Sequence, residues 1–343
     1  MCAKINLIAG GAGFIGSHLC ERLIAAGEYV ICLDNLQTGS VGNVKHLFPH
    51  PNFQFIEADI RDTVNIPASR IYNLACPASP KAYQKDPIGT LTTSIQGSLN
   101  LLDLAKRYDA RILLASTSEV YGDPHVHPQH ETYFGNVNPI GPRACYDEGK
   151  RAAETLFFDF HRVHGVEIKV ARIFNTYGPV MQFDDGRVVS NFIVQALAGQ
   201  NITIYGDGSQ TRSFCFVSDM VEGLVRLMDS PSPVLGPINL GNPMEYKVSD
   251  LANIVVRLTG SISSIAYFDI PEDDPKRRRP DISAARDVLG WAPLVPLEDG
   301  ILKTVSYFDN CPPKVGTRDL VSSSVMHNTD RDHLIKNVPG IYE

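Results

Sequence analysis

The sequence predicts an α/β protein built on a doubly wound parallel sheet, with a smaller lobe toward the C-terminus. Three observations carry this prediction. Short apolar runs alternate with helical patterns over about the first 175 residues, which is typical of a parallel sheet covered on both faces. A glycine-rich turn joins the first of these runs to the first helix. After Pro179 the segments become shorter and richer in Gly and Asp.

The strands and helices of the sheet region can be placed in chain order. Each predicted strand is a short, largely continuous apolar run, as expected for strands buried on both faces. Right-handed crossovers through the intervening helices then give the doubly wound arrangement. The predicted strands are Ile5–Ala9, Tyr29–Asp34, Phe53–Glu57, 71–74, 111–116 and Ile168–Ile173, and the predicted helices are 16–26, 90–107 and 145–164.

The change in segment length and in Gly and Asp content along the chain suggests three parts. Residues 1–179 are expected to form a dinucleotide-binding domain, and residues 180–310 a substrate-binding lobe with some elements returning to the main sheet. Residues 311–343 form a polar tail without clear periodicity, and no role is assigned to it.

Composition and charge exclude several classes of protein. The chain has 343 residues, of which 43% are hydrophobic and 20% charged, as in ordinary globular proteins. The net charge of −7 disfavours non-specific binding to nucleic acids or anionic membranes. Seven scattered cysteines without a CxxC pair indicate reduced thiols, and no membrane span or signal peptide is visible. A cytoplasmic location is therefore expected.

The glycine-rich turn predicts a site for NAD. Gly10, Gly13 and Gly16 follow the first strand and open the first helix, so backbone N–H groups can approach a pyrophosphate at the helix N-terminus. Asp34 ends the next strand, where its carboxylate can accept hydrogen bonds from ribose hydroxyls and would repel a 2′-phosphate. The competing interpretation is a turn that only packs a helix on a strand. Asp59 is expected either at the adenine edge or as a helix N-cap.

A Tyr–Lys pair predicts the chemical site. Tyr146 and Lys150 are four residues apart and share one helical face. A nearby ammonium favours the phenolate, so Tyr146 can act as a base near neutral pH. The same spacing is common by chance on solvated helices, but here it follows a dinucleotide motif and the segment 116–122 at a strand end.

Several longer motifs resemble the extended short-chain dehydrogenase/reductase family of nucleotide-sugar enzymes, over about residues 4–308. The segments that carry this resemblance are more specific than the glycine turn alone. They are residues 10–16, 74–80, 115–124, 138–150, 171–179, 185–191, 205–212 and 274–281. The resemblance implies a Rossmann fold, bound NAD, a UDP-sugar substrate and a homodimer formed through a four-helix bundle.

The resemblance also implies roles for individual residues. The catalytic set is Thr117, Ser118, Glu119, Tyr146, Lys150 and Arg278. The cofactor-binding set is Gly10, Gly13, Phe14, Ile15, Gly16, Asp34, Asn35, Thr38, Gly39, Asp59, Ile60, Leu74, Ala75, Pro77, Thr93, Tyr146, Lys150, Thr176 and Arg187. The substrate-binding set is Asn100, Glu119, Asn175, Val189, Asn191, Tyr205, Gln210, Arg212 and Arg278.

Within this family the resemblance is greatest to members that decarboxylate UDP-glucuronate to UDP-xylose through a 4-keto intermediate. The triplet Thr117-Ser118-Glu119 favours this activity, because Ser118 cannot act as the acid that the Asp of Thr-Asp-Glu provides in sugar 4,6-dehydratases. Glu119 is then expected on the C5 and carboxylate side of the sugar. A UDP-glucuronate 4-epimerase that uses the same Tyr, Lys and NAD without losing CO₂ remains open, as does a regulatory dinucleotide-binding protein. The triplet could instead be only a strand-end Ser/Thr turn.

Three further features of the sequence bear on the site. Arg278 stands in a basic run, which is more often a solvated face. Thr92 stands where family members carry Lys in a substrate-contacting segment. His125, His127 and His130 lie in a Pro-containing loop without a partner cluster, so no metal site is expected.

Overall fold

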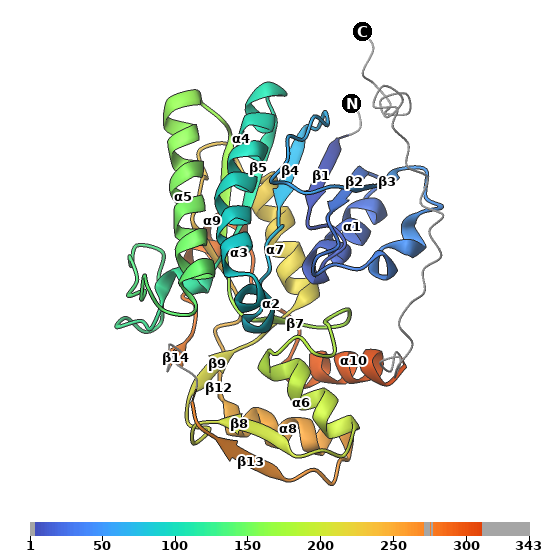
Figure 1. Cartoon of the computed structure of the whole chain (residues 1–343), viewed down its shortest axis with the longest axis vertical. Helices are drawn as coiled ribbons and strands as arrows, with labels where there is room; N and C mark the ends of the chain where they lie inside the picture. The colour runs from blue at the N-terminus through green and yellow to red at the C-terminus, as the bar shows by residue number, and fades with distance from the viewer. Residues whose placement is uncertain (1–3, 271–274, 276, 311–343) are drawn as a thin grey trace.

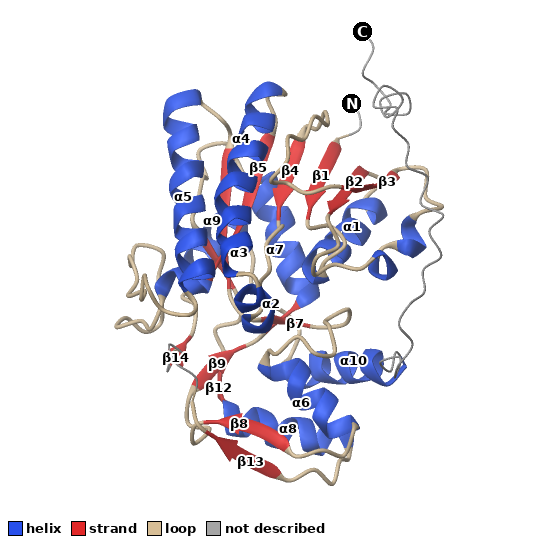
Figure 2. Cartoon of the chain, viewed as in Figure 1, coloured by secondary structure: helices blue, strands red, loops and turns tan. Residues whose placement is uncertain are grey.

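Seven parallel strands form the central sheet of the computed structural model, which describes residues 4–270, 275 and 277–310. The strand order is β11-β6-β5-β4-β1-β2-β3 (Figures 1 and 2). The strands are β1 (Ile5–Ala9), β2 (Tyr29–Asp34), β3 (Phe53–Glu57), β4 (Arg70–Asn73), β5 (Arg111–Thr117), β6 (Ile168–Ile173) and β11 (Ile238–Leu240). The six predicted strands are confirmed with small shifts at their ends, and β11 was not predicted.

Alternate residues along each strand serve two separate cores. Ile8 of β1 points toward α1 (Phe14–Ala25) and α7 (Val217–Asp229), whereas Leu7 and Ala9 belong to the core on the opposite face. That opposite face is covered by α4 (Ser98–Arg107) and α5 (Ala144–His164), which stand together in front of the sheet in Figure 1. The predicted helix 90–107 is in fact α3 (Pro87–Thr92), a π-helical stretch (Thr93–Gly97) and α4.

A smaller lobe lies below the sheet in Figure 1. Its β8 and β13 pair in parallel, and β9 lies between β12 and β14. Its elements are α6 (Val188–Leu197), α8 (Val248–Thr259), α10 (Leu297–Asn310), β8 (Ile202–Tyr205), β9 (Thr211–Ser213), β12 (Glu245–Lys247), β13 (Ile265–Phe268) and β14 (Arg277–Arg278). Short connecting elements are α2 (Pro80–Lys85), α9 (Ser283–Leu289), β7 (Thr176–Tyr177), β10 (Cys215–Phe216) and the 3₁₀ turns Val41–Asn43, Lys45–Leu47 and Ser118–Tyr121.

The chain returns from the lobe to the main sheet. Both α7 and β11 follow residue 179, yet β11 pairs with β6 and α7 packs against β5 and β6. The division at residue 179 stays a prediction, and the expected tail 311–343 lies outside the described residues. In the part of the chain that the structure describes, no helix combines the length and apolarity needed to cross a bilayer.

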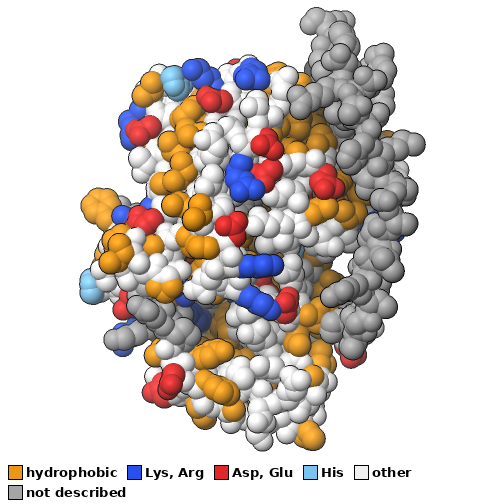
Figure 3. All heavy atoms as spheres, viewed as in Figure 1, with side chains coloured by type: hydrophobic (Ala, Val, Ile, Leu, Met, Phe, Trp, Pro, Cys, Tyr) orange, Lys and Arg blue, Asp and Glu red, His pale blue; other side chains and the backbone are white. Residues whose placement is uncertain are grey.

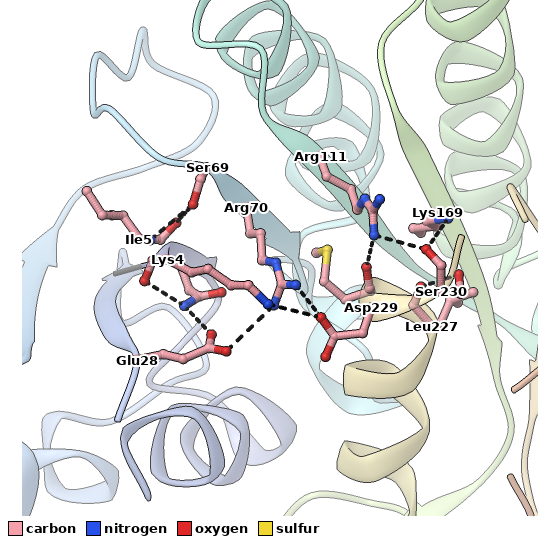
Figure 4. A network of polar contacts seen from close by, with 12 residues as sticks. Lys4, Ile5, Glu28, Ser69, Arg70, Arg111, Lys169, Leu227, Asp229 and Ser230 are labelled. Carbon is pink, nitrogen blue, oxygen red and sulfur yellow. Dashed lines mark hydrogen bonds and ion pairs between the residues drawn. The ribbon is translucent and has the colours of Figure 1, made fainter. Parts of the chain in front are cut away.

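Basic side chains hold α7 to the amino ends of the strands (Figure 4). Arg70 at the start of β4 pairs with Asp229 at the end of α7. Arg111 at the start of β5 donates to the Ser230 carbonyl at 3.0 Å, and the fully buried Lys169 donates to the carbonyls of Pro231 and Val234 at 2.8 and 2.7 Å. These cations satisfy carbonyls at and just beyond the C-terminus of a helix, where its dipole favours positive charge. Burial lowers the pKa of Lys169 to about 8.

A buried ion pair fixes α5 against the carboxyl ends of β5 and β6. The Arg172 guanidinium of β6 donates to both oxygens of Glu154, at 3.0 and 2.7 Å. The Ser116 hydroxyl of β5 donates to the same carboxylate at 2.6 Å. Because the side chains of Glu154 and Arg172 are each only 11% exposed, either one alone would leave an uncompensated buried charge.

We expect Glu154→Ala to destabilise the fold by about 3–5 kcal/mol, the usual cost of breaking a buried ion pair. Denaturant unfolding followed by circular dichroism measures this loss. The matched control is Glu148→Ala on the same helix, whose pair with Arg151 is more than a third exposed and should contribute about 1 kcal/mol or less. Equal losses for the two variants would show that the Glu154 pair does not anchor α5.

Candidate active site

A cavity of about 670 Å³ lies at the carboxyl ends of the strands, between the sheet and the lobe. This is the edge of an open parallel sheet at which ligands bind, because the strand order reverses there. The cavity is lined from one side by the turn 10–16 and the ends of β2, β4 and β5, and from the other by α6, β9 and Arg278.

The glycine turn forms a cradle that fits a pyrophosphate. Gly10 has φ +79°, and a Cβ atom there would lie 2.8 Å from the Leu74 carbonyl carbon, so a side chain is excluded. Gly13 is the N-cap of α1, and no side chain caps this helix end. Gly10, Gly13, Phe14, Ile15 and Gly16 all line the cavity. The N-terminus of α1 therefore offers backbone donors and the positive end of a helix dipole to an anion.

Asp34 lies where a ribose diol would be recognised. Its two oxygens accept hydrogen bonds from the backbone N–H groups of Ala12 and Leu36, at 2.9 and 2.8 Å. Burial raises its pKa, and these two hydrogen bonds oppose the rise. A carboxylate has further lone pairs for hydroxyl donors. Gly39 does not line the cavity but packs beside Asp34, because a Cβ atom at Gly39 would lie 2.8 Å from Asp34 Oδ1. Contact of Gly39 with a cofactor stays a prediction.

Asp59 caps a turn and not a helix, because no helix begins between β3 and β4, all of whose connecting residues the structure describes. It lines the cavity, and its Oδ1 atom accepts a hydrogen bond from the Arg61 N–H at 2.8 Å, as a local capping residue would. Asn35 donates to its other oxygen at 2.8 Å. The Arg61 side chain lowers its pKa to about 2. Contact with adenine stays a prediction.

The loop 179–187 lines the cavity beside the glycine turn and contacts residues 38 and 81. Gln182 donates to the Thr38 carbonyl at 2.6 Å, and Lys81 pairs with Asp184 at 2.6 Å. Arg187 lies 5.7 Å from the centre of the Phe14 ring. The loop thus brings residues of both parts of the chain around one space. The other expected cofactor-binding residues also line it: Asn35, Thr38, Ile60, Leu74, Ala75, Pro77, Thr93 and Thr176.

The triplet 117–119 turns the chain out of β5 into the cavity. Thr117 Oγ1 accepts a hydrogen bond from the Glu119 N–H at 3.2 Å, so the Ser/Thr turn considered from the sequence is present. All three side chains nevertheless line the cavity, together with Tyr146 and Lys150 of α5. The next residues continue as the 3₁₀ turn, which ends at Gly122 with φ +61°. The turn therefore serves to present the triplet.

Tyr146 and Lys150 share one face of α5, as predicted. Lys150 Nζ donates to the Ala115 carbonyl at 2.9 Å and lies 5.9 Å from the centre of the Tyr146 ring. Tyr83 stacks on that ring, with centres 5.2 Å apart and planes 5° apart. Burial raises the pKa of Tyr146 well above its usual value and lowers that of Lys150. The Tyr146 pKa is therefore raised, not lowered as the sequence suggested, and desolvation of the phenolate is the largest cause.

Glu119 is held between two arginines. Arg143 Nη2 donates to Glu119 Oε2 at 3.0 Å, and Arg278 pairs with Oε1. Arg278 also donates to the Gly122 carbonyl at 2.9 Å. Burial raises the pKa of Glu119, but Arg278 and Arg143 outweigh it and hold the pKa at about 2. Far from lying on a solvated face, Arg278 is 2% exposed.

The remaining substrate-side predictions divide into residues at the cavity and residues away from it. Asn175, Val189, Asn191, Tyr205, Gln210 and Arg212 all line it. Asn100 does not, because its side-chain amide donates to the carbonyls of residues 60–62, at 2.8 to 3.0 Å. The structure therefore corrects the expectation for Asn100, which braces a loop. Thr92 is exposed on α3, away from the cavity, and its hydroxyl donates to the Ile88 carbonyl at 2.8 Å.

Sequence reasoning missed Arg143, Tyr83 and Lys81. Arg143 was within a recognised motif, and its place just before the helix that carries Tyr146 was the available signal. No pattern marked Tyr83 or Lys81, because stacking and the Lys81 ion pair depend on the tertiary fold. Among the described residues no group of three or more His, Cys, Asp or Glu side chains could hold a metal, and His127 pairs with Glu245 at 3.1 Å.

Comparison with known proteins places these features in a family. Residues 7–304 match the family model described as GDP-mannose 4,6 dehydratase. The chain is 55% identical over 305 residues to UDP-glucuronic acid decarboxylase 1 of Xenopus tropicalis, which covers 89% of this chain and 72% of that protein. It is 56% identical over 296 residues to UDP-glucuronic acid decarboxylase 3 of Arabidopsis thaliana, which covers 86% of each chain.

Solved structures support the same fold. The UDP-glucuronic acid 4-epimerase of Bacillus cereus, in complex with UDP-glucuronic acid and NAD, has a TM-score of 0.80 and 28% sequence identity. The match covers 90% of this chain and 99% of the epimerase. The UDP-glucose 4-epimerase of Thermotoga maritima, solved with UDP-glucose, has a TM-score of 0.80, 30% identity and coverage of 90% and 99%.

Asp147, next to Tyr146, generates a prediction about pH. Its side chain is buried, and burial and then the charge of Glu119 raise its pKa to about 8 despite Arg143 and Arg278. Between about pH 5 and 8 the unfolded carboxyl group is ionised while the folded one holds its proton. Folding stability should therefore fall as pH rises, by about 1 kcal/mol per pH unit.

The Asp147→Asn variant lacks this titrating group. Its free energy of unfolding, measured with urea, should therefore fall less steeply with pH than that of the wild type. Asp159→Asn, an exposed change on the same helix, serves as the control and should keep the wild-type slope. Parallel pH profiles for all three proteins would show that Asp147 is ionised in the folded state.

Proposed function

The chain belongs to the extended short-chain dehydrogenase/reductase family of nucleotide-sugar enzymes, and from this membership we propose that it is an NAD-dependent UDP-glucuronate decarboxylase that forms UDP-xylose. One observation carries the proposal. The triplet 117–119, Tyr146 and two arginines meet at one cavity, in a chain 53–56% identical to curated UDP-glucuronic acid decarboxylases. The 4-epimerases of solved structure are more distant, at 28–30% identity.

The cavity has residues suited to bind both NAD and the UDP-sugar. The turn 10–16 and Asp34 fit the pyrophosphate and ribose of NAD, and Arg187 lies over the same half. The lobe supplies Arg212, whose planar fork suits a diphosphate, and Tyr205 and Gln210 for the nucleotide. When bound, oxidised NAD supplies a reversible hydride acceptor and a positive charge that favours the Tyr146 phenolate.

The protein residues position the sugar and move protons. Tyr146 Oη takes the proton of the sugar 4-hydroxyl as C4 is oxidised, with Thr117 and Ser118 hydrogen-bonding near that oxygen. The product is a β-keto acid. Its C5–C6 bond breaks with release of CO₂, and the electron pair is delocalised from C5 into the C4 ketone. Protonation at C5 and reduction at C4 then give UDP-xylose, so NAD is restored and one proton is consumed.

Ser118 excludes one alternative chemistry and leaves another to experiment. A hydroxyl at this position cannot protonate a departing hydroxyl group as the Asp of a 4,6-dehydratase does. A 4-epimerase would use the same Tyr146 and Lys150, returning hydride to the other face of the keto-sugar with no loss of CO₂. Product analysis separates the two activities directly.

We expect purified protein given UDP-glucuronate to release CO₂ and UDP-xylose in equal amounts, without net formation of NADH. Tyr146→Phe keeps the ring that stacks on Tyr83 but lacks the proton acceptor, so turnover should fall by about 10²–10⁴-fold. Anion-exchange chromatography of the nucleotides and trapping of CO₂ measure both results.

Other outcomes would contradict particular parts of the proposal. UDP-galacturonate without CO₂ would identify a 4-epimerase. A 4-keto pentose with stoichiometric free NADH would show that the cycle does not close. Activity of Tyr146→Phe within about threefold of wild type would remove Tyr146 from the mechanism.

A homodimer formed through α4 and α5 is also part of the proposal. Figure 3 shows hydrophobic side chains gathered over this face. Leu156 and Phe160 of α5 are only partly buried, and Val163 is 72% exposed. Leu102, Ala105 and Ala153, which lie on the same two helices, pack instead into the chain's own core. A two-fold axis would cover the remaining apolar stripe with the same stripe of a second copy.

Light scattering at micromolar concentration should give twice the 37.7 kDa mass of one chain. Leu156→Asp should shift the mass toward the monomer, because a charge at a two-fold interface is buried twice. Ile262→Asp, at a 94% exposed position of the lobe, should leave the dimer intact. A wild-type monomer would refute the dimer, and circular dichroism checks that the variants fold.

A further inference from the structure

Residues 179–187, called the strap from here on, connect β7 to α6 and line the cavity beside the glycine turn. The apolar side chains of the strap pack against other parts of the protein. Met181 is 2% exposed, and the ring centre of Phe183 lies 4.8 Å from that of Phe308 on α10. Gln182 and Asp184 instead contact the N-terminal part of the chain. The strap is therefore held by apolar packing on one side and by polar contacts on another.

The two polar contacts lie on opposite sides of the glycine turn. Gln182 Nε2 donates to the carbonyl of Thr38, which follows β2, at 2.6 Å. Lys81 Nζ donates to Asp184 Oδ2, also at 2.6 Å, and Lys81 belongs to α2, which follows β4. In the sheet β1 stands between β4 and β2, and the glycine turn follows β1. The contacts of the strap therefore flank the turn that suits the pyrophosphate of NAD.

These contacts can break without loss of the core. The side chains of Lys81 and Asp184 are 63% and 74% exposed, and an exposed ion pair of this kind is weak. The strap backbone also approaches α2, because a Cβ atom at Gly186 would lie 3.4 Å from the Lys81 Cβ atom. Val180 has φ +72°, a left-handed conformation that is costly for a β-branched residue. The observed conformation of the strap therefore depends on the contacts that hold it.

We propose that Lys81 and Asp184 form a latch that keeps the strap closed over the bound NAD and slows its release. Both are positioning residues, because they act through the strap and not on the reacting atoms. The inference goes beyond the proposed reaction, since it concerns how long the cofactor stays and not which product forms. In the proposed cycle such retention has a chemical purpose. The hydride taken from C4 has to return to the same sugar, and loss of the cofactor between the two steps would leave a keto-sugar.

The test measures release of the cofactor in the absence of any sugar. Protein loaded with NADH is mixed with excess NAD⁺, and the loss of bound NADH fluorescence gives the rate of release. Lys81→Glu places two like charges together and should speed release by about two- to fivefold, the range expected from loss of an exposed ion pair. Asp184→Lys should speed it by a similar factor. The double variant Lys81→Glu with Asp184→Lys restores opposite charges and should release NADH at close to the wild-type rate.

Two comparisons separate a latch from a direct effect of charge on the cofactor. If the Lys81 ammonium acted directly on the phosphates of NAD, the added positive charge of Asp184→Lys would slow release, whereas the latch predicts faster release. Lys85→Glu makes the same charge change at an exposed position of α2 that does not line the cavity, and it should leave the rate unchanged. Thermal unfolding checks that each variant is folded.

Slower release from Asp184→Lys would overturn the proposal, as would unchanged rates in both single variants. A double variant that releases NADH as fast as the single variants would show that the two residues do not act as a pair. Because no sugar is present, faster release from the single variants and its reversal in the double variant would uphold the latch even if the protein formed no UDP-xylose. That result would refute only the proposed reaction.

Discussion

The buried pair of Glu154 and Arg172 is the interaction on which the geometry of the site depends. Through Ser116 it joins α5 to the carboxyl ends of two neighbouring strands, one helical turn beyond Lys150. Lys150 bonds the Ala115 carbonyl of the same strand that ends in the triplet. Tyr146 and Arg143 precede it on α5, so this buried ion pair helps to fix the distance from both residues to the triplet. At the amino ends of the strands, Arg111 and Lys169 anchor α7 through the carbonyls that follow it. The carboxyl ends of the strands are left open for ligands.

Charge is distributed unevenly between the surface and the site. The chain as a whole carries −7, yet the cavity gathers Arg143, Arg278, Arg212 and Arg187 on its walls. Each of these arginines has an internal partner, so the positive charge is held in place before a substrate arrives. Such preorganised groups stabilise an anionic ligand without the cost of reorganising solvent around it. A net negative chain, which disfavours non-specific polyanion binding, thus still offers several arginines to a UDP-sugar in its cavity.

The sequence was sufficient for the sheet, because the strands follow local pattern, and for most of the cavity lining, which the family resemblance implied. Continuous apolar runs located six strands, and the glycine turn, Asp34 and the Tyr146–Lys150 pair were found from spacing. What could not be predicted depends on long-range contact. β11 is three residues long and is identified as a strand only by pairing with β6. Asn100 was assigned to the substrate, but its amide is saturated by three backbone carbonyls. The pKa of Tyr146 was judged from a neighbouring charge, whereas burial, which no spacing reveals, dominates it.

The return of β11 and Arg278 from the lobe has a consequence for how the protein folds. β6 stays an unpaired sheet edge until residues 238–240 have been synthesised, and Arg278 reaches the Gly122 carbonyl across 156 positions of sequence. Contacts between residues so far apart in sequence form late, because closing a long loop costs chain entropy before the contact can stabilise the fold. During synthesis the N-terminal half can collapse with its dinucleotide cradle in place, but with an open edge and with Arg143 as the partner of Glu119 before Arg278 arrives. The part of the chain that completes the active site therefore also supplies β11, the strand that covers the open edge of β6.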